Sequence, residues 1–217
     1  MTLTKGDFIT LDFTGKQTET NEVFDTTKEE AAKKNNIYEQ QVPYEPITIC
    51  IGEGHVLPGL DKALEGQKPN SKTEVTLKPE DAFGKKSAKA IKLMPLKVFQ
   101  KQQINPRPGL EVNIDDQRGT IKSISGNRVI VDFNHPLSGR ELTYELEIGE
   151  QITDTQKQAE SLVNMALRHK TQVEVKETQA TITFPVELPE KITKEITKTL
   201  KRLTKIETVK YQTPKKD

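Results

Sequence analysis

The sequence predicts an α+β protein with more than one structural unit. Several short segments place apolar residues at every second position, which is the pattern of strands with one buried face. The last third of the chain instead reads as helix, strand, strand, helix and strand. Hydrophobic residues make up only 33% of the 217 residues and charged residues 30%, so we expect small cores rather than one large core.

The N-terminal part of the chain contains three predicted strands. Residues 5–13 and 47–51 alternate apolar and polar side chains, and a third strand is expected around residues 73–77. We interpret Gly15 and the polar run after it as a turn. Residues 28–46 are charged, partly helix-forming and closed by two prolines, so we interpret them as an inserted surface flap.

A very short helix is predicted within the stretch GEGHVLPGLDKALEG, residues 52–66. Leu60, Ala63 and Leu64 recur at helical spacing, and Gly66 ends the helix. An isolated helix of this length is marginal in water, so tertiary contacts must hold it. Either it fills a curved sheet as ordinary core, or its apolar lead-in forms the floor of a pocket.

The middle of the chain predicts a small β unit of roughly 50 residues, near the lower size limit for independent stability. The strand pattern breaks at residues 80–84, and residues 85–94 are lysine-rich with scattered apolar side chains. Four short strands are then expected at residues 110–114, 119–124, 128–133 and 142–148, the last of them outside the small unit.

The C-terminal unit, from about Thr153, is predicted to contain two amphipathic helices and three strands. Asp154 is expected to cap the first helix, and Pro189 to open the second. The apolar stripes are Ala159, Leu162, Val163 and Ala166 in the first helix, and Ile192, Ile196, Leu200 and Leu203 in the second. The strands are expected around residues 173–175, 180–184 and 206–211.

Several classes of function are disfavoured by the sequence. The three histidines, His55, His135 and His169, have no second ligand at metal spacing, so we expect no metal and no cofactor. The chain has neither a serine nucleophile elbow nor a phosphate-binding glycine loop. The net charge of +1 and the lack of an apolar span argue against nucleic-acid or membrane binding by the molecule as a whole. The single cysteine, Cys50, fits a reducing compartment, and we expect a cytoplasmic protein.

With those classes disfavoured, the remaining candidate site is a set of apolar and aromatic residues beside one acidic residue. Each lies on a predicted strand or beside a turn, as the walls of a groove would. Ordinary core is the alternative interpretation for each apolar member, and turn capping is the alternative for Asp25. The set comprises Phe13, Phe24, Asp25, Ile47, Val56, Leu57, Leu60, Phe83 and Tyr144.

Four runs of sequence, in this order, carry a family resemblance: VFDTT, PITICIGEGHVLPGLDKALEGQKPN, PEDAFGK and NHPLSGRELTYELEI. Together they resemble the FKBP-type peptidyl-prolyl cis-trans isomerases, and in particular the long archaeal form of the SlyD-like branch. The resemblance implies a curved antiparallel sheet wrapped on a short helix. It further implies an isomerase domain of residues 1–85 and 135–151, an inserted flap domain of residues 86–134, and an extra C-terminal domain of residues 152–217.

The resemblance also implies roles for the candidate residues. Phe13, Phe24 and Tyr144 fall on the aromatic wall of the family's pocket, and Asp25 on its acidic neighbour. Leu57 falls on the backbone donor to a bound carbonyl. The remaining positions line the substrate pocket: Ile47, Val56, Leu60 and Phe83. Leu60 stands where single-domain members carry tryptophan, Ile47 replaces an aromatic residue, and Phe83 lacks a tyrosine hydroxyl, so we expect weaker binding of the macrolide inhibitor.

The implied function is isomerisation of X–Pro bonds in unfolded or nascent chains, together with chaperone activity in the insert; the alternative is a binding chaperone without catalysis. The insert offers an apolar surface or, on the other interpretation, only its own core: Leu93, Met94, Leu96, Val98 and Phe99. The second C-terminal helix carries a lysine face that is either merely solvated or contacts the ribosome: Lys191, Lys194, Lys198, Lys201 and Lys205. The oligomeric state is left open.

Overall fold

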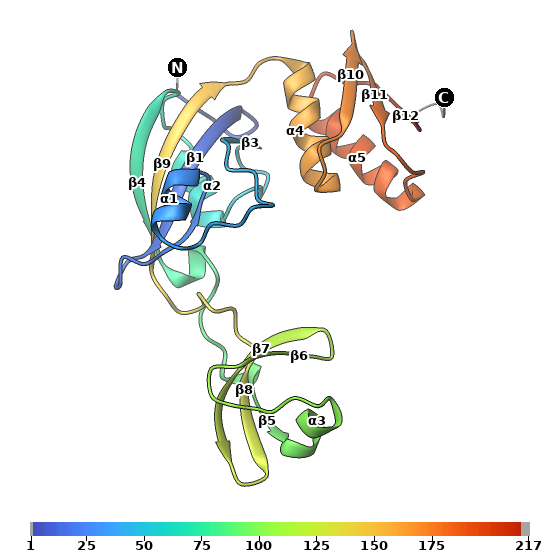
Figure 1. Ribbon diagram of the computed structural model, residues 1–217. Coiled ribbons are helices and arrows are strands. Elements are labelled where there is room, and N and C mark those ends of the chain that lie inside the picture. Colours follow the sequence, from blue (N-terminus) through green and yellow to red (C-terminus); the bar gives the residue numbers. More distant parts are fainter. Residues whose placement is uncertain (1, 214–217) are drawn as a thin grey trace.

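The computed structural model describes residues 2–213 and contains three sheets, each with its own hydrophobic cluster. We refer to a first unit (β1 to β4 with β9), a middle unit (β5 to β8) and a C-terminal unit (β10 to β12 with two helices). The middle unit projects from one end of the first unit, while the C-terminal unit lies beside its opposite end (Figure 1). No helix within these residues is long and apolar enough to cross a membrane.

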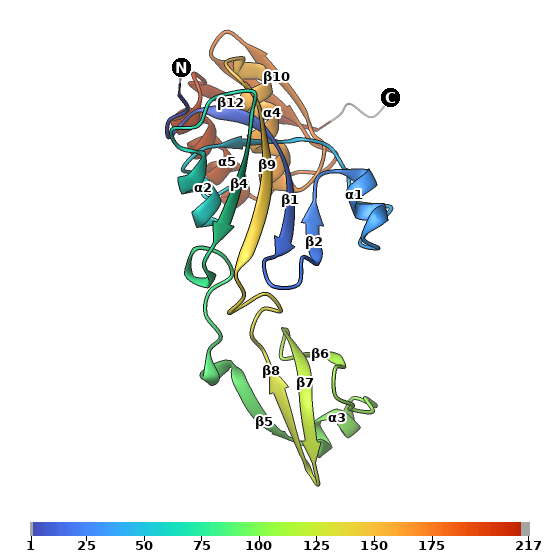
Figure 2. The same ribbon diagram turned by 90° about the vertical axis from the view of Figure 1, so that its left-hand side faces the viewer.

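The first unit is a five-stranded sheet that bends around a short helix (Figures 1 and 2). Its strands follow the order β2-β1-β9-β4, and β3 pairs with the other half of β1, all antiparallel. The elements are β1 (Phe8–Gln17), β2 (Val23–Thr26), α1 (Glu29–Lys34), β3 (Ile47–Cys50), α2 (Pro58–Leu64), β4 (Ser71–Leu77), the 3-10 helix η1 (Pro79–Asp81) and β9 (Leu142–Gln151).

Helix α2 buries Leu60 and Leu64 in the cluster formed by the first sheet, which explains how seven residues hold helical structure. The predicted turn at Gly15 is wrong. Strand β1 continues through this residue to Gln17, pairing with β2 and β9. Residues 14–17 show no alternation of apolar and polar side chains, so nothing in the sequence indicated a strand there. The apolar cover over Gly15 comes instead from the rings of Phe24 and Tyr144 on the neighbouring strands.

The middle unit is a four-stranded antiparallel sheet in the order β5-β8-β7-β6. Its elements are η2 (Ala88–Ala90), β5 (Ile91–Pro95), α3 (Leu96–Lys101), β6 (Glu111–Ile114), β7 (Gln117–Ser125) and β8 (Arg128–Asp132). Strand β5 and helix α3 were missed from the sequence. The reason is that β5 exposes most of its residues, so it carries little of the alternation expected of a half-buried strand.

Two chain segments connect the middle unit to the first, and hydrogen bonds join them. The Phe133 N–H donates to the Ala90 carbonyl at 2.9 Å. Asn134 accepts from the Ser87 N–H at 2.8 Å and donates to the Ser87 carbonyl at 3.1 Å. Closer to the first unit, the Gly139 N–H donates to the carbonyl of Gly84 at 2.8 Å. The connection is therefore a paired neck rather than two loose linkers.

The C-terminal unit packs two helices on a three-stranded sheet of order β10-β11-β12, whose last pair is parallel. Asp154 caps the first helix as predicted, by accepting from the Gln156 N–H at 2.8 Å. Ile192 is 38% exposed, so it does not belong to the buried face assigned to the second helix. The elements are α4 (Thr155–Leu167), β10 (Gln172–Lys176), β11 (Gln179–Thr183), α5 (Glu190–Leu203) and β12 (Thr208–Gln212).

The C-terminal unit shares its hydrophobic cluster with the first unit. Phe8 and Cys50, from β1 and β3, are buried in the cluster that contains Ile152, Leu162 and Leu200. The Ile152 N–H also donates to the carbonyl of Phe8 at 2.7 Å. Burial of a phenylalanine across this boundary favours a fixed arrangement of the two units.

Candidate active site

Three neighbouring strands bring Gly15, Asp25 and Tyr144 side by side. Gly15 of β1 pairs with Asp25 of β2 on one side and with Tyr144 of β9 on the other. A Cβ atom added at Gly15 would lie 2.8 Å from the Phe24 ring and 2.8 Å from the Tyr144 ring, closer than real side chains approach. Glycine here makes room for both rings, a role that the sequence interpretation of Gly15 as a turn missed.

The predicted aromatic residues form one cluster of rings over this glycine. The centroids of Phe24 and Tyr144 lie 5.8 Å apart with the rings at 84°, and those of Phe13 and Tyr144 lie 6.0 Å apart at 57°. Phe24 also meets Phe83 edge-on, at 6.4 Å and 81°. Such tilted and edge-to-face pairs contribute about 0.5–1.5 kcal/mol each beyond the area that they bury. The rings therefore hold one another in place.

All eight predicted apolar site residues belong to the hydrophobic cluster of the first unit. Leu60 and Tyr144 are buried, whereas the others are only partly buried and keep part of their surface open to solvent. The structure thus brings together a buried floor and a half-exposed apolar rim. The rim residues are Phe13, Phe24, Ile47, Val56, Leu57 and Phe83.

Asp25 is the charged group beside these rings. The residue is exposed as a whole, yet burial by the surrounding protein raises the pKa of its carboxyl, and the Thr26 N–H acts in the opposite direction. Burial, followed by the negative charge of Asp25, raises the pKa of the Tyr144 hydroxyl, which is therefore protonated at neutral pH. The site thus offers an acceptor and an O–H donor close together.

Two threonines fasten β2 to β1 next to these residues. The Thr27 Oγ1 accepts from the Phe13 N–H at 2.9 Å and donates to Asp12 Oδ1 at 2.6 Å. The Thr26 Oγ1 donates to the Phe13 carbonyl at 3.0 Å, and the Thr27 N–H donates to the same carbonyl at 3.0 Å. These bonds fix the strand that carries Phe24 and Asp25, and so they fix the ring positions.

The loop before α2 presents Leu57. Its carbonyl accepts from the N–H groups of Leu60 and Asp61 at 2.9 and 3.0 Å. Its own N–H donates to no group among residues 2–213, which leaves a donor available to a ligand. The buried Asp61 shapes the loop, because its two carboxylate oxygens accept from the N–H groups of Gly52 and Gly54 at 3.0 and 2.9 Å.

His135 extends the aromatic cluster and was not among the predicted site residues. Its ring stacks parallel on Phe83 with centroids 4.2 Å apart. Ser138 Oγ donates to the Phe83 carbonyl at 2.9 Å and holds the two segments together. The position of His135 within the run NHPLSGRELTYELEI was the available signal. Ala82 and Leu137 also pack on the cluster and were likewise missed.

The residues predicted to form an apolar surface on the middle unit are divided by the structure. Phe99 is 0% exposed and lies in the unit's own core, against which Met94, Leu96 and Val98 also pack. Assigning Phe99 to the surface was therefore wrong, because one side of α3 faces the core. Leu93 is 57% exposed.

Comparison with protein families identifies two regions of the chain. A family profile described as "FKBP-type peptidyl-prolyl cis-trans isomerase" matches residues 1–100. A second profile, described as "FKBP26, IF domain", matches residues 92–137, which include most of the middle unit.

Curated proteins of the same kind are similar over much of the chain. A short-type peptidyl-prolyl cis-trans isomerase of Methanocaldococcus jannaschii is 30% identical over 144 residues, covering 66% of this chain and 90% of that protein. A probable FKBP-type 16 kDa isomerase of Pseudomonas fluorescens is 35% identical over 108 residues, covering 48% and 71%. The isomerase SlyD of Haemophilus influenzae is 33% identical over 107 residues, covering 48% and 56%. The chain therefore belongs to the FKBP-type peptidyl-prolyl cis-trans isomerases, a family of enzymes.

Proposed function

We propose that this protein accelerates rotation about X–Pro bonds in unfolded or partly folded chains. The observation that carries the proposal is the convergence of four aromatic rings and Asp25 in a cluster that the Leu57 side chain also joins, with a Leu57 N–H that donates to no group among residues 2–213. A proline ring would rest on the half-exposed aromatic rim above Leu60. The carbonyl next to it would accept from the Leu57 N–H.

The chemistry requires no cofactor. Rotation about an X–Pro bond is opposed by a barrier of about 20 kcal/mol, because the twisted amide loses its resonance. An apolar surface disfavours the charge-separated planar amide relative to the twisted one. A donor aimed at the twisted carbonyl stabilises it further. A rate gain of about 10⁴ requires about 5.5 kcal/mol of selective transition-state binding.

Asp25 and Tyr144 would act on the polar part of the substrate. The protonated Tyr144 hydroxyl can donate to a carbonyl oxygen or to Asp25. The Asp25 carboxylate repels a carbonyl oxygen turned toward it and so favours the rotated amide. We assign Phe13, Phe24, Asp25, Leu57 and Tyr144 to catalysis, and Ile47, Val56, Leu60 and Phe83 to substrate binding.

The test is proline-limited refolding of an unfolded protein with and without this chain. We expect acceleration by the wild type and a loss of about 10-fold or more in Asp25→Ala and Phe24→Ala, because each removes a group at the reacting bond. Glu19→Ala, an exposed acid in the β1–β2 turn, is the matched control and is expected to retain full activity. Absence of acceleration by the wild type would contradict catalysis and favour a binding chaperone.

We further propose that the middle unit holds unfolded chains as an inserted flap domain. An exposed apolar patch supports this proposal: Leu93 of β5 pairs directly with Ile130 of β8, and Ile91 lies on the same face as Leu93. The patch lies on the face opposite the core, and none of its residues belongs to the core cluster. Binding there would raise the concentration of substrate prolines near the isomerase site.

We also propose a location and a further partner. The buried thiol of Cys50 forms no disulfide, which fits action in the cytoplasm. The four lysines on α5 and Lys205 just after it are exposed, which fits a contact with an acidic partner such as the ribosome. Salt-sensitive co-sedimentation with ribosomes, weakened in Lys198→Glu, is the expected result. Co-sedimentation equal in both proteins would contradict the contact.

A further inference from the structure

We infer that Arg202, in the C-terminal unit, is a positioning residue for the proposed isomerase site. Through Glu53 it holds the loop of residues 52–57 that presents the Leu57 N–H. The inference rests on the proposed function, and it gives the C-terminal unit a part in the reaction although none of its residues lies in the aromatic cluster.

The contact itself is a two-atom bridge between residues 149 positions apart. Arg202 Nη1 donates to Glu53 Oε1 at 2.8 Å, and Nη2 donates to Oε2 at 2.5 Å. The Glu53 side chain is only 13% exposed. Hydrogen bonding from Arg202 lowers the pKa of this carboxyl, so the pair is ionised at neutral pH. Because a planar guanidinium donates to both carboxylate oxygens, it fixes the orientation of the Glu53 carboxylate as well as its distance from Arg202.

The loop that carries Glu53 has unusual backbone freedom. Gly52 and Gly54 both adopt positive φ, at 80° and 70°, on either side of Glu53. A glycine on each side allows many conformations, so the native one must be selected by contacts. Within the first unit, Asp61 holds the two glycine N–H groups, and His55 Nδ1 accepts from the Cys50 N–H at 3.0 Å. Neither contact holds the Glu53 side chain.

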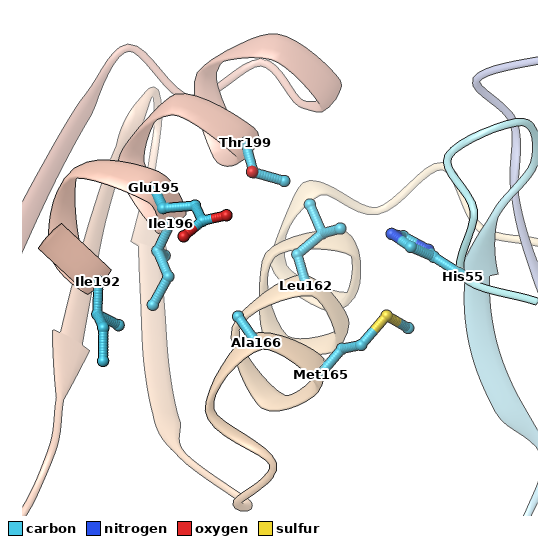
Figure 3. A pocket seen from close by; sticks show the side chains of 8 residues that line it. All are labelled: His55, Leu162, Met165, Ala166, Ile192, Glu195, Ile196 and Thr199. Carbon is cyan, nitrogen blue, oxygen red and sulfur yellow. The ribbon is translucent and has the colours of Figure 1, made fainter. Parts of the chain in front are cut away.

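Packing between the loop and the C-terminal helices is incomplete. A crevice of about 310 Å³ lies where the loop meets the two C-terminal helices, lined by His55, by Leu162, Met165 and Ala166 of α4, and by Ile192, Glu195, Ile196 and Thr199 of α5. Figure 3 shows the α4 side chains between His55 on one side and the α5 side chains Ile192, Glu195 and Ile196 on the other. Among residues 2–213, the bridge to Arg202 is the one ion pair that joins this loop to the C-terminal unit. It is therefore the charged contact through which that unit can restrain the Glu53 side chain.

The C-terminal unit is a firm support for such a contact. Phe8 and Cys50 of the first unit are buried in its hydrophobic cluster, and Cys50 lies two residues before the loop begins at Gly52. Arg202 lies in the last turn of α5, two residues after the buried Leu200. The backbone of Arg202 is thus held by the packed helix α5, from which its side chain reaches the loop.

The test measures isomerisation of a short proline peptide and hydrogen exchange of the loop. We expect Arg202→Ala and Glu53→Gln each to lower kcat about three- to tenfold with little change in KM, because the Leu57 donor is less well placed in the transition state. Arg202→Lys keeps the positive charge but not the two parallel N–H donors, and we expect an intermediate loss of kcat. Lys201→Ala, an exposed cation next to Arg202, is the matched control and is expected to match the wild type.

Exchange of the Gly52 and Gly54 N–H groups separates positioning from a general loss of structure. Both donate to Asp61, so they report loop order without reference to activity. We expect them to exchange faster in Arg202→Ala while the N–H groups of β9 are unchanged. Unchanged kcat and exchange in both variants would overturn the inference, as would a loss of kcat accompanied by exchange that rises equally throughout the chain. A wild type without isomerase activity would overturn the proposed function instead, and the exchange rates would still decide whether Arg202 orders the loop.

Discussion

The first and middle units expose apolar side chains in two different ways. In the first unit the exposed rim rests on buried Leu60 and Tyr144, and hydrogen bonds from Thr26 and Thr27 fix the strand beside it. In the middle unit Leu93 and Ile130 stand on the outer face of a sheet, away from its core. The first arrangement suits a reaction that a misplacement of about 1 Å would slow, and the second suits contacts that tolerate many sequences.

The largest expected effect comes from breaking the fixed arrangement at Gly15. In Gly15→Ala the new methyl group meets the rings of Phe24 and Tyr144 at 2.8 Å, so both rings must move. We expect kcat/KM to fall about 100-fold and stability to fall by about 1–3 kcal/mol, as for overpacked sites. Peptide isomerisation and urea unfolding measure the two effects.

The matched control for this change is Gly126→Ala in the turn between β7 and β8. This glycine has a φ of 55° with no atom near the added methyl group, so alanine is strained there but displaces nothing. We expect a stability loss of about 1 kcal/mol with normal peptide isomerisation. Full activity of Gly15→Ala would show that the ring positions do not matter to the reaction.

The second prediction breaks the apolar patch and leaves the site intact. Replacing both Leu93 and Ile130 by serine removes exposed apolar area without opening the core. We expect suppression of aggregation of an unfolded client to weaken about 5-fold, because about 2 kcal/mol of gross contact is lost before ordering costs are subtracted. Isomerisation of a short peptide is expected to be unchanged.

The control for the patch replaces Lys92 and Lys97 by serine, two exposed residues of the same segment. These variants lose long side chains but no apolar patch, so client binding is expected to persist. Equal aggregation suppression by the patch variant and the wild type would place the holding surface elsewhere. A neighbouring candidate is the hollow of about 400 Å³ beside Leu96 and Ile104.

The first unit and the middle unit also differ in how much of their secondary structure could be predicted from the sequence. The first half of β1, strands β3, β4 and β9, and the short helix were recognisable because buried and exposed side chains alternate or recur at helical spacing; strand β2 and the second half of β1 were not predicted. Strand β5 was not, because its residues are mostly exposed. The apolar members of the site were found through their motifs, and they all lie in one cluster.

Residues whose roles depend on contacts with distant parts of the chain could not be predicted from the sequence. Gly15 has no side chain, and only the pairing of three strands shows what it makes room for. His135 is exposed and 52 positions from Phe83, so its stacking depends on how the neck folds. Arg202 reaches Glu53 across two units. Periodicity and local motifs carry no information on such long-range contacts, which depend on the tertiary fold.

The last prediction contrasts two aspartates, and its change at Asp25 is the smallest stability effect expected. Burial raises the pKa of Asp25, whereas Asp132 in the middle unit has a lowered pKa. Burial also opposes the charge of Asp132, but it is outweighed by Asn134, which donates from its N–H at 2.9 Å and from Nδ2 at 2.7 Å, and by two nearby lysines. The folded protein therefore holds a proton on Asp25 more tightly than the unfolded chain does, and on Asp132 less tightly.

The two carboxyls thus give stability opposite dependences on pH. Asp25 lowers stability as pH rises above about 3.8, and Asp132 contributes stability that is lost as pH falls below that value. We expect Asp132→Asn to cost about 1–3 kcal/mol at pH 7 and Asp25→Asn to gain about 0.5 kcal/mol or less while slowing isomerisation. Urea unfolding from pH 3 to 7 measures both. A loss of stability at pH 7 in Asp25→Asn would mean that this carboxylate supports the fold, in the manner of Asp132, rather than being held at a cost in stability for the reaction.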